Sequence, residues 1–126
     1  LDAAVKYSKE RHQFGVPIGS KQLVQEQIAD MATSVAVGEL LSLHLATSWE
    51  NKPLRRFDVS LAKRHNCQVA LDVARRARAV MGAHGIDLNN HVIRQLLNLE
   101  ASSTYGGTHE IHGLVLGKTL TQESAF

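Results

Sequence analysis

Apolar residues recur every three or four positions along most of this chain, which is the spacing of one face of an α-helix. The longest run lies in residues 20–50, where polar Gln27 interrupts a face made of Leu23, Val24, Ile28, Met31, Val35, Leu41, Leu45 and Trp49. A second run lies in residues 58–81 and contains Leu61, Val69, Val73, Ala77, Val80 and Met81. The two runs predict two long amphipathic helices, with Ser20 and Asp58 as candidate N-caps.

Shorter helices are predicted around these two. Residues 1–12 have the composition of a helix end, a fourth helix is expected from near Asn90, and a fifth from Thr108 to about Thr121. Glycine or proline interrupts the pattern in residues 13–20, 51–57 and 82–85, which we expect to be loops or turns, and we expect no β-sheet. Two long helices joined by a short loop should pack antiparallel, so the sequence predicts an all-α, up-and-down helical bundle.

The composition supports one helical domain. The chain has 126 residues, of which 44% are hydrophobic and only 5% aromatic, so its core must consist mainly of aliphatic side chains. It begins at Leu1 in the middle of a helical pattern, and we therefore expect residues 1–126 to be a segment of a longer chain. No apolar stretch of about 18 residues and no leader are found, so we expect neither a membrane span nor a signal peptide.

Charge and cysteine content narrow the classes of partner. The formal net charge is +2, with no long run of like charge, which argues against a nucleic-acid-binding tail. The single Cys67 cannot form an internal disulfide, which suits a reducing compartment. Three basic clusters fit either a solvated helix face or a phosphate-binding surface. They are Arg55-Arg56, Lys63-Arg64, and Arg75-Arg76 with Arg78.

Seven histidines raise the question of a metal site. His109 and His112 are three residues apart on one predicted helix face, which is a ligand spacing. No cysteine or carboxylate cluster completes the set, so a surface or packing role is the preferred interpretation and no metal is predicted. The chain also lacks a nucleophile elbow and a dinucleotide-binding fingerprint.

The stretch Thr104–Ile111 is the strongest candidate for a binding site on residue chemistry alone. Gly106 and Gly107 permit positive φ and close approach of a ligand, and Thr108 stands at the expected N-cap of the last helix. Free N–H groups at a helix N-terminus can receive an anion or a carbonyl oxygen. The alternative is an ordinary connection between two helices, because glycine is common in tight turns.

Three motifs occur in a fixed order at domain-scale spacing. They are Glu10-Arg11-His12-Gln13-Phe14-Gly15, Met81-Gly82-Ala83-His84-Gly85-Ile86 and Tyr105-Gly106-Gly107-Thr108-His109-Glu110-Ile111. Together they resemble the C-terminal helical domain of the acyl-CoA dehydrogenases, over essentially the whole chain. The intervening residues 91–94 and 98–100 look most like the glutaryl-CoA dehydrogenase branch.

The resemblance implies an FAD-dependent enzyme that removes hydrogens from the α and β carbons of an acyl-CoA thioester. It implies that Arg11 contacts the FAD pyrophosphate of a neighbouring subunit and that Phe14 packs near the cofactor. Further positions that match cofactor contacts are Ala79, Val80, Met81, Gly82, Ala83, Thr108 and Glu110. Tyr105 and Gly107 match positions that line the acyl-CoA pocket. At Ala83 and His84 the family usually has glycine and asparagine, so close backbone approach at Ala83 is in doubt.

The main departure from the family is Gly106, because most members carry there the glutamate that abstracts the α-proton. Glycine has no titratable group, so this chain supplies no catalytic base at that position. Two readings stay open: a base carried on an earlier helix upstream of Leu1, or a base-less scaffold or partner subunit of the same ancestry. The resemblance further implies self-association as a dimer or tetramer, an electron-transfer flavoprotein as acceptor, and a bacterial cytoplasmic or mitochondrial matrix location.

Overall fold

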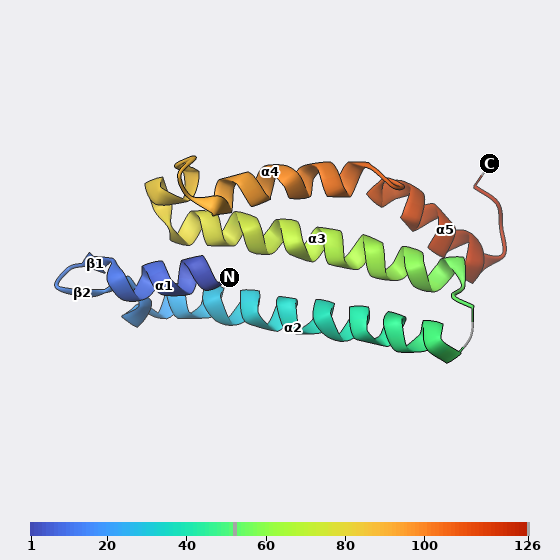
Figure 1. Ribbon diagram of the computed structural model, residues 1–126, viewed down its shortest axis with the longest axis horizontal. Coiled ribbons are helices and arrows are strands. Elements are labelled where there is room, and N and C mark those ends of the chain that lie inside the picture. Colours follow the sequence, from blue (N-terminus) through green and yellow to red (C-terminus); the bar gives the residue numbers. More distant parts are fainter. Residues whose placement is uncertain (52, 126) are drawn as a thin grey trace.

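The computed structural model describes residues 1–51 and 53–125, and five α-helices account for most of them (Figure 1). The helices are α1 (Asp2–Glu10), α2 (Gln22–Asn51), α3 (Arg56–Val80), α4 (His91–Thr104) and α5 (His109–Thr121). Two short 3₁₀ segments, η1 (Ile18–Ser20) and η2 (Gly82–Ile86), precede α2 and α4. The predicted all-α helical bundle is therefore confirmed.

Helix α3 is the centre of the bundle. It lies between α2 on one side and the consecutive pair α4 and α5 on the other, and each of these three helices contacts it (Figure 1). Helix α2 runs antiparallel to α3, as predicted, and α4 and α5 return along α3 in the opposite direction to it (Figure 1). The 25 residues of α3 make it about 37 Å long, so its two ends support separate surfaces.

The apolar core gathers around the C-terminal half of α3. Its buried members come from α1, α2, the end of α3 and α4, and are Ala4, Met31, Val73, Ala77, Met81 and Val92. Partly buried side chains such as Tyr7, Ile28 and Val80 pack against them. Helix α5 contributes no buried residue, although it lies on the other half of α3. The bundle is therefore packed tightly at one end and lightly at the other.

The expectation of no sheet is wrong at one place. Strands β1 (His12–Gln13) and β2 (Val16–Pro17) form a two-stranded antiparallel ladder in which His12 pairs with Pro17 and Gln13 with Val16. Between them Phe14 and Gly15 have φ angles of 55° and 80°, the left-handed pair that a tight two-residue hairpin turn requires. The segment predicted as a loop is thus a small hairpin between α1 and η1.

Two predicted helix starts also need correction. Ser20 ends η1 and its hydroxyl donates to the Pro17 carbonyl at 2.7 Å, so it does not cap α2, which begins at Gln22. Asp58 is the third residue of α3, and Arg55 is the N-cap. The Asp58 carboxylate accepts two hydrogen bonds from the Arg55 guanidinium, at 2.8 and 2.9 Å, and stands in the first turn, where negative charge is favourable.

The other predicted boundaries agree more closely. The Thr108 side chain accepts a hydrogen bond from Ile111 N, so it caps α5 as predicted. The fourth helix was expected to start near Asn90, and the Asn90 side chain accepts from Val92 N at the start of α4. The connection expected over residues 51–57 is shorter than predicted, because α3 already begins at Arg56. Residue 52, within that connection, lies outside the described residues.

Helix α2 changes one expectation from the sequence. By length and composition alone it could cross a membrane, since an 18-residue window has a mean hydropathy of 1.2, and only 11% of that window is buried. The expectation that no apolar stretch is long enough is therefore wrong. Apolar side chains of α2 such as Leu40 and Trp49 are largely exposed in the isolated chain. The same helix also carries Asp30, whose carboxylate forms an ion pair with Arg76 of α3 at 2.9 Å.

Candidate functional site

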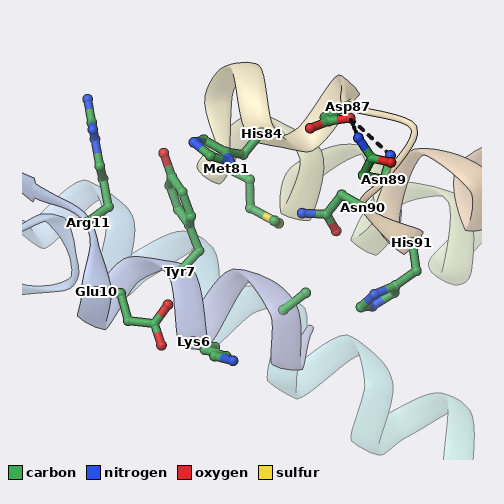
Figure 2. Close-up of a pocket in the computed structure, with 11 residues that line it drawn as sticks. Lys6, Tyr7, Glu10, Arg11, Met81, His84, Asp87, Asn89, Asn90 and His91 are labelled. Atoms are coloured by element: carbon green, nitrogen blue, oxygen red, sulfur yellow. Dashed lines mark hydrogen bonds between the residues drawn. The ribbon is translucent and has the colours of Figure 1, made fainter.

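The first two sequence motifs meet in a cleft beside the C-terminal end of α3 (Figure 2). We call this the arginine cleft and define it by Tyr7, Arg11 and residues 80–84. It opens into two adjoining pockets of about 600 and 380 Å³ that share Tyr7, Arg11 and His84. Figure 2 shows Arg11 and Tyr7 extending from α1 to the side on which His84 lies. The Tyr7 and His84 rings lie 5.3 Å apart between centroids.

Arg11 owes its place to the end of α1. The helix stops at Glu10, and Arg11 turns to an extended backbone while its N–H still bonds the Tyr7 carbonyl at 2.8 Å. Its own carbonyl accepts from Ile18 N at 2.8 Å, which ties the hairpin back to the helix. Within the described residues the guanidinium has no ion-pair partner, so its donors are available to a phosphate.

The second motif gives the cleft an accessible main chain. Gly82 has a φ of 55°, and a Cβ added there would meet no atom within 4 Å, so the backbone is open to a ligand. Val80, Gly82 and Ala83 line the smaller pocket and buried Met81 lines the larger one, whereas exposed Ala79 lines neither. The structure therefore brings most of the predicted second-motif residues to Arg11.

Phe14 lies apart from this cleft at the tip of the hairpin. Its side chain is 91% exposed, and the Lys21 ammonium lies 5.9 Å from the centroid of its ring. A large apolar side chain on a left-handed backbone that is this exposed buries little apolar surface within the described chain. The exposed position of the Phe14 ring is compatible with packing against a bound cofactor, which is the role that the resemblance implies.

The third motif forms a different surface, the glycine turn, which we define as Tyr105–Thr108. Gly106 and Gly107 have φ angles of 65° and 93°, so both positions favour glycine. Gly106 and Gly107 line a pocket of about 320 Å³ together with Ser60, Ile111 and His112, whereas the Tyr105 side chain is exposed outside it.

Side chains from α3 and α5 hold the glycine turn. The Lys63 ammonium donates to the Tyr105 carbonyl and, at 2.8 Å, to the Gly107 carbonyl. The His112 ring contacts the Gly106 carbonyl at 3.3 Å through Nε2 and the hydroxyl of buried Ser60 at 3.0 Å through Nδ1. The carbonyls of Tyr105, Gly106 and Gly107 are thus directed toward side chains of α3 and α5.

Thr108 and Glu110 complete the start of α5. The Thr108 hydroxyl accepts from Ile111 N at 3.3 Å, as a capping side chain does. Hydrogen bonds from the backbone N–H of Glu110 itself and from the Thr108 side chain, with smaller help from the charges of His109 and Arg64, hold the pKa of Glu110 below its ordinary value. The carboxylate is therefore folded onto the helix N-terminus and ionised at neutral pH.

The arginine cleft and the glycine turn do not meet within one chain. Lys63, under the turn, and Val80, beside the cleft, are 17 residues apart on α3, or about 25 Å along its axis. A cofactor that contacted both the arginine cleft and the glycine turn would have to span this distance within one chain. Alternatively, it would contact the cleft of one copy and the glycine turn of another. The geometry is consistent with the sequence-based expectation of a site shared between subunits.

Sequence reasoning missed Lys63, Ser60 and His112 as supports of the glycine turn. Lys63 was grouped with Arg64 as a solvated or phosphate-binding pair, yet its partners are main-chain carbonyls 42 and 44 residues away. The other basic clusters agree better with a solvated face, since Arg55, Arg75 and Arg76 pair with carboxylates. No local pattern marks the Lys63 contacts, because they depend on how α4 and α5 return along α3.

The residues of the arginine cleft fit an FAD pyrophosphate by their chemistry. An unpaired guanidinium offers two parallel donors to phosphate oxygens, and open main chain at Gly82 permits close approach. For a metal, by contrast, the described residues contain no group of three or more His, Cys, Asp or Glu side chains with suitable placement. His109 and His112 do not converge with a third ligand, and His112 serves the glycine turn instead.

Comparison with known proteins agrees with this architecture. The family model described as acyl-CoA dehydrogenase, C-terminal domain, matches residues 1–121. Among curated relatives, subunit CarC of the caffeyl-CoA reductase-Etf complex of Acetobacterium woodii is 30% identical over 98% of this chain. That match covers 32% of CarC, so the chain spans about a third of the length of this relative.

Solved structures give the same picture. A glutaryl-CoA dehydrogenase from Mycobacterium smegmatis is 42% identical, with a TM-score of 0.96, over 99% of this chain and 32% of its own. A Mycobacterium smegmatis glutaryl-CoA dehydrogenase in complex with FADH2 is 36% identical, with a TM-score of 0.96 and the same coverage. These likenesses confirm the predicted fold and the resemblance to the glutaryl-CoA dehydrogenase branch.

Proposed function

The chain belongs to the acyl-CoA dehydrogenase family as its C-terminal domain, and we propose that the protein carrying it is an FAD-dependent acyl-CoA dehydrogenase. The proposed reaction removes hydrogens from the α and β carbons of an acyl-CoA thioester. In it this domain contributes part of the FAD site, part of the acyl-CoA site and a subunit interface. The chain spans about a third of the length of the relatives that it matches, so the activity is proposed for a longer protein that contains this domain.

One observation carries the proposal: the chain presents two differently built binding surfaces at the positions that the family resemblance assigns to cofactor and substrate. The arginine cleft offers the free Arg11 guanidinium beside open main chain at Gly82. The glycine turn offers main-chain N–H groups at the start of α5, opposite carbonyls held by Lys63. An unrelated helical connection would need neither arrangement.

Each surface has a distinct task in this proposal. Bound FAD would supply the oxidising power for removal of a hydride from the β carbon. Arg11 binds and orients the pyrophosphate through charge-assisted hydrogen bonds. The N–H groups of the glycine turn bind the thioester carbonyl oxygen, which acidifies the α-proton by stabilising the negative charge that develops on that oxygen.

The base that takes the α-proton is not on this chain at the family position, which is Gly106. Two versions of the function remain in the proposal. In the first, a carboxylate from sequence upstream of Leu1 reaches the same α carbon. In the second, the protein is a base-less scaffold or partner subunit, and a glycine at position 106 fits both versions equally.

A Gly106→Glu substitution in the full-length protein separates these versions. The new carboxylate would stand close to the Lys63 ammonium, because a Cβ at residue 106 lies 3.3 Å from Lys63 Nζ, and this charge would keep the carboxylate ionised, as a base must be. The φ of 65° at this position costs about 1–2 kcal/mol for a side chain with a Cβ. Gly106→Gln carries the same strain without a titratable group and is the matched control.

The measurement is the rate at which acyl-CoA reduces the flavin under anaerobic conditions. A positioned base contributes about 10²- to 10⁴-fold, so a gain of this size in Gly106→Glu over both parent and Gly106→Gln means that the pocket is kept and the base is absent. An active parent with no such gain means that the base lies upstream. No reduction in any form, with flavin and acyl-CoA both bound, contradicts the dehydrogenase function.

The remaining parts of the proposal concern partners. We propose that the protein self-associates as a dimer or tetramer, because α2 exposes Leu23, Leu40, Leu43 and Trp49 in the isolated chain. We further propose an electron-transfer flavoprotein as acceptor, which the name of the CarC complex supports, and a bacterial cytoplasmic or mitochondrial matrix location.

A further inference from the structure

We propose that Lys63 is a positioning residue for acyl-CoA: it orients the glycine turn so that three consecutive main-chain N–H groups face the thioester carbonyl. The inference rests on the proposed function, since it concerns the substrate of that site. It assigns a specific task to a lysine on α3 that lies 43 residues before Gly106 in the sequence.

The contacts of Lys63 are unusual for a helical lysine. Half-buried on α3, it directs its ammonium under the glycine turn, where it donates to the Tyr105 carbonyl and to the Gly107 carbonyl at 2.8 Å. The ammonium also lies 5.8 Å from the centroid of the Tyr105 ring. No carboxylate in the described part of the chain forms an ion pair with Lys63, so the turn itself supplies its acceptors.

The orientation of the N–H groups follows from these contacts. In a trans peptide the C=O and the following N–H point in opposite directions, and the described chain has no cis peptide. Because the carbonyls of residues 105, 106 and 107 point toward Lys63 and His112, the N–H groups of Gly106, Gly107 and Thr108 point away from them. None of these three N–H groups has a hydrogen-bond partner among the described residues. Successive free N–H groups in a turn of this kind form a concave receptor for an oxygen that carries negative charge.

The turn needs such an external support. Two adjacent glycines with positive φ have many alternative conformations, and α5 buries no side chain that could fix them through the core. His112 restrains the middle carbonyl through a longer contact of 3.3 Å, whereas Lys63 bonds the carbonyls on both sides of it. Lys63 is therefore the residue that sets the direction of the outer two peptide planes.

The test compares two ligands on the full-length holoenzyme with its flavin reduced, because reduced flavin cannot accept a hydride and the thioester stays intact. One ligand is glutaryl-CoA, and the other is S-(4-carboxybutyl)-CoA, a thioether of equal length with a methylene in place of the carbonyl. The dissociation constant of each is measured by calorimetry for the parent, Lys63→Met, Lys63→Arg and the control Lys118→Met. Lys118 is an exposed lysine near the end of α5.

We expect a loss of affinity only for the ligand that has the thioester carbonyl. Lys63→Met weakens glutaryl-CoA binding about tenfold to hundredfold, the loss expected for one or two hydrogen bonds to a partly charged oxygen, and leaves thioether binding unchanged. Lys63→Arg, which can still donate to both carbonyls, recovers most of the loss, and Lys118→Met changes neither ligand. Equal losses for both ligands, or no loss for the thioester, overturn the inference. A parent that binds neither ligand overturns the proposed function and this inference with it.

A second measurement needs no substitution, so it applies even if Lys63→Met does not fold. Amide hydrogen exchange of the unmodified holoenzyme reports directly on the N–H groups of residues 106–108. They should exchange rapidly without ligand and become protected by glutaryl-CoA but not by the thioether. Protection without ligand would mean that the N–H groups are already bonded, and it would overturn the inference.

Discussion

The arginine cleft and the glycine turn lie on the same helix but are stabilised in different ways. The cleft stands on the apolar core, where Met31, Ala77 and Met81 are almost fully buried. The glycine turn has no such foundation, because α5 buries no residue, and polar contacts from Lys63 and His112 hold it instead. The apolar core cluster therefore lies toward the C-terminal end of α3, and polar contacts are the main support near its N-terminal end.

This difference matches what each surface presents. A rigid apolar base lets the cleft offer a long charged side chain, Arg11, whose guanidinium can adjust to a phosphate. The turn offers main-chain N–H groups, which are useful only when the peptide planes have a fixed direction. Side chains that bond the opposite carbonyls fix that direction without filling the pocket.

The largest effect should come from disturbing the base of the cleft. A Cβ on Gly85 would lie 2.3 Å from the Arg78 carbonyl oxygen, so Gly85→Ala must displace main chain at the end of α3. We expect it to lower the free energy of unfolding by about 3 kcal/mol or more, at the upper end of overpacking effects. Urea unfolding followed by circular dichroism measures this change.

Gly117→Ala is the matched control, since a Cβ there meets nothing within 4 Å. In the middle of α5 this substitution should stabilise the helix by about 0.5–1 kcal/mol. If the two variants unfolded at the same urea concentration, the cleft would not depend on close packing beneath it, and the contrast between the two ends of α3 would fail.

The next effect concerns the side chain that the cleft presents. Arg11→Ala in the full-length protein should lose about 1.5–3 kcal/mol of FAD affinity, the contribution of a hydrogen bond to a charged group. Arg11→Lys should recover only part of it, because an ammonium lacks the planar fork. Flavin retention after gel filtration measures the loss, and Lys9→Ala, an exposed change in the last turn of α1, is the control. Unchanged retention in Arg11→Ala would remove Arg11 from the cofactor site.

The fold could be predicted from the sequence where the signal is local. Helical spacing predicted the long helices, and the cap at Thr108 and the helix start near Asn90 depend on residues within three positions. Ser20 and Asp58 were wrongly predicted as N-caps because both residue types are common N-caps and both lie close to a helix start. Ser20 bonds inside η1 instead, and Asp58 pairs with Arg55 one residue before the helix. Propensity placed these N-caps within three residues of the observed helix starts but could not decide between competing hydrogen-bond partners.

The site could be predicted only in part, for a similar reason. Arg11 and Gly82 stand out through motifs, and the structure brings them into one cleft. Lys63 carries no local signal, since it lies on an ordinary amphipathic helix next to Arg64. Its contacts with the glycine turn arise only because α4 runs back along α3 and brings residues 105–107 next to it. The hairpin at Phe14 was missed because a non-glycine residue with positive φ is uncommon.

The smallest predicted effect separates hydrogen bonding from charge at the start of α5. The pKa of Glu110 is lowered mainly by its own backbone N–H and by Thr108, and less by His109 and Arg64. A lowered folded pKa means that Glu110 stabilises the fold above the ordinary glutamate pKa of about 4.3 and loses this effect as pH falls through the folded value. Glu110→Gln should therefore be less stable than the parent at neutral pH, and the two should converge in acid.

Salt then shows which cause dominates. In 1 M salt the electrostatic interaction between two exposed charges decays over about 3 Å, whereas hydrogen bonds are largely unaffected. If the hydrogen bonds are the main cause, the pKa of the Glu110 carboxyl followed by NMR should stay below its ordinary value in both low and high salt, with only a small rise in 1 M salt. The control is Thr108→Val, which removes the hydroxyl and should raise the pKa even at low salt. A pKa that returns to the ordinary value in salt would show that the charges of His109 and Arg64 lower it more than the hydrogen bonds do, and an ordinary pKa already at low salt would show that neither acts on Glu110. In both cases Glu110 would not be part of the hydrogen-bonded structure at the start of α5.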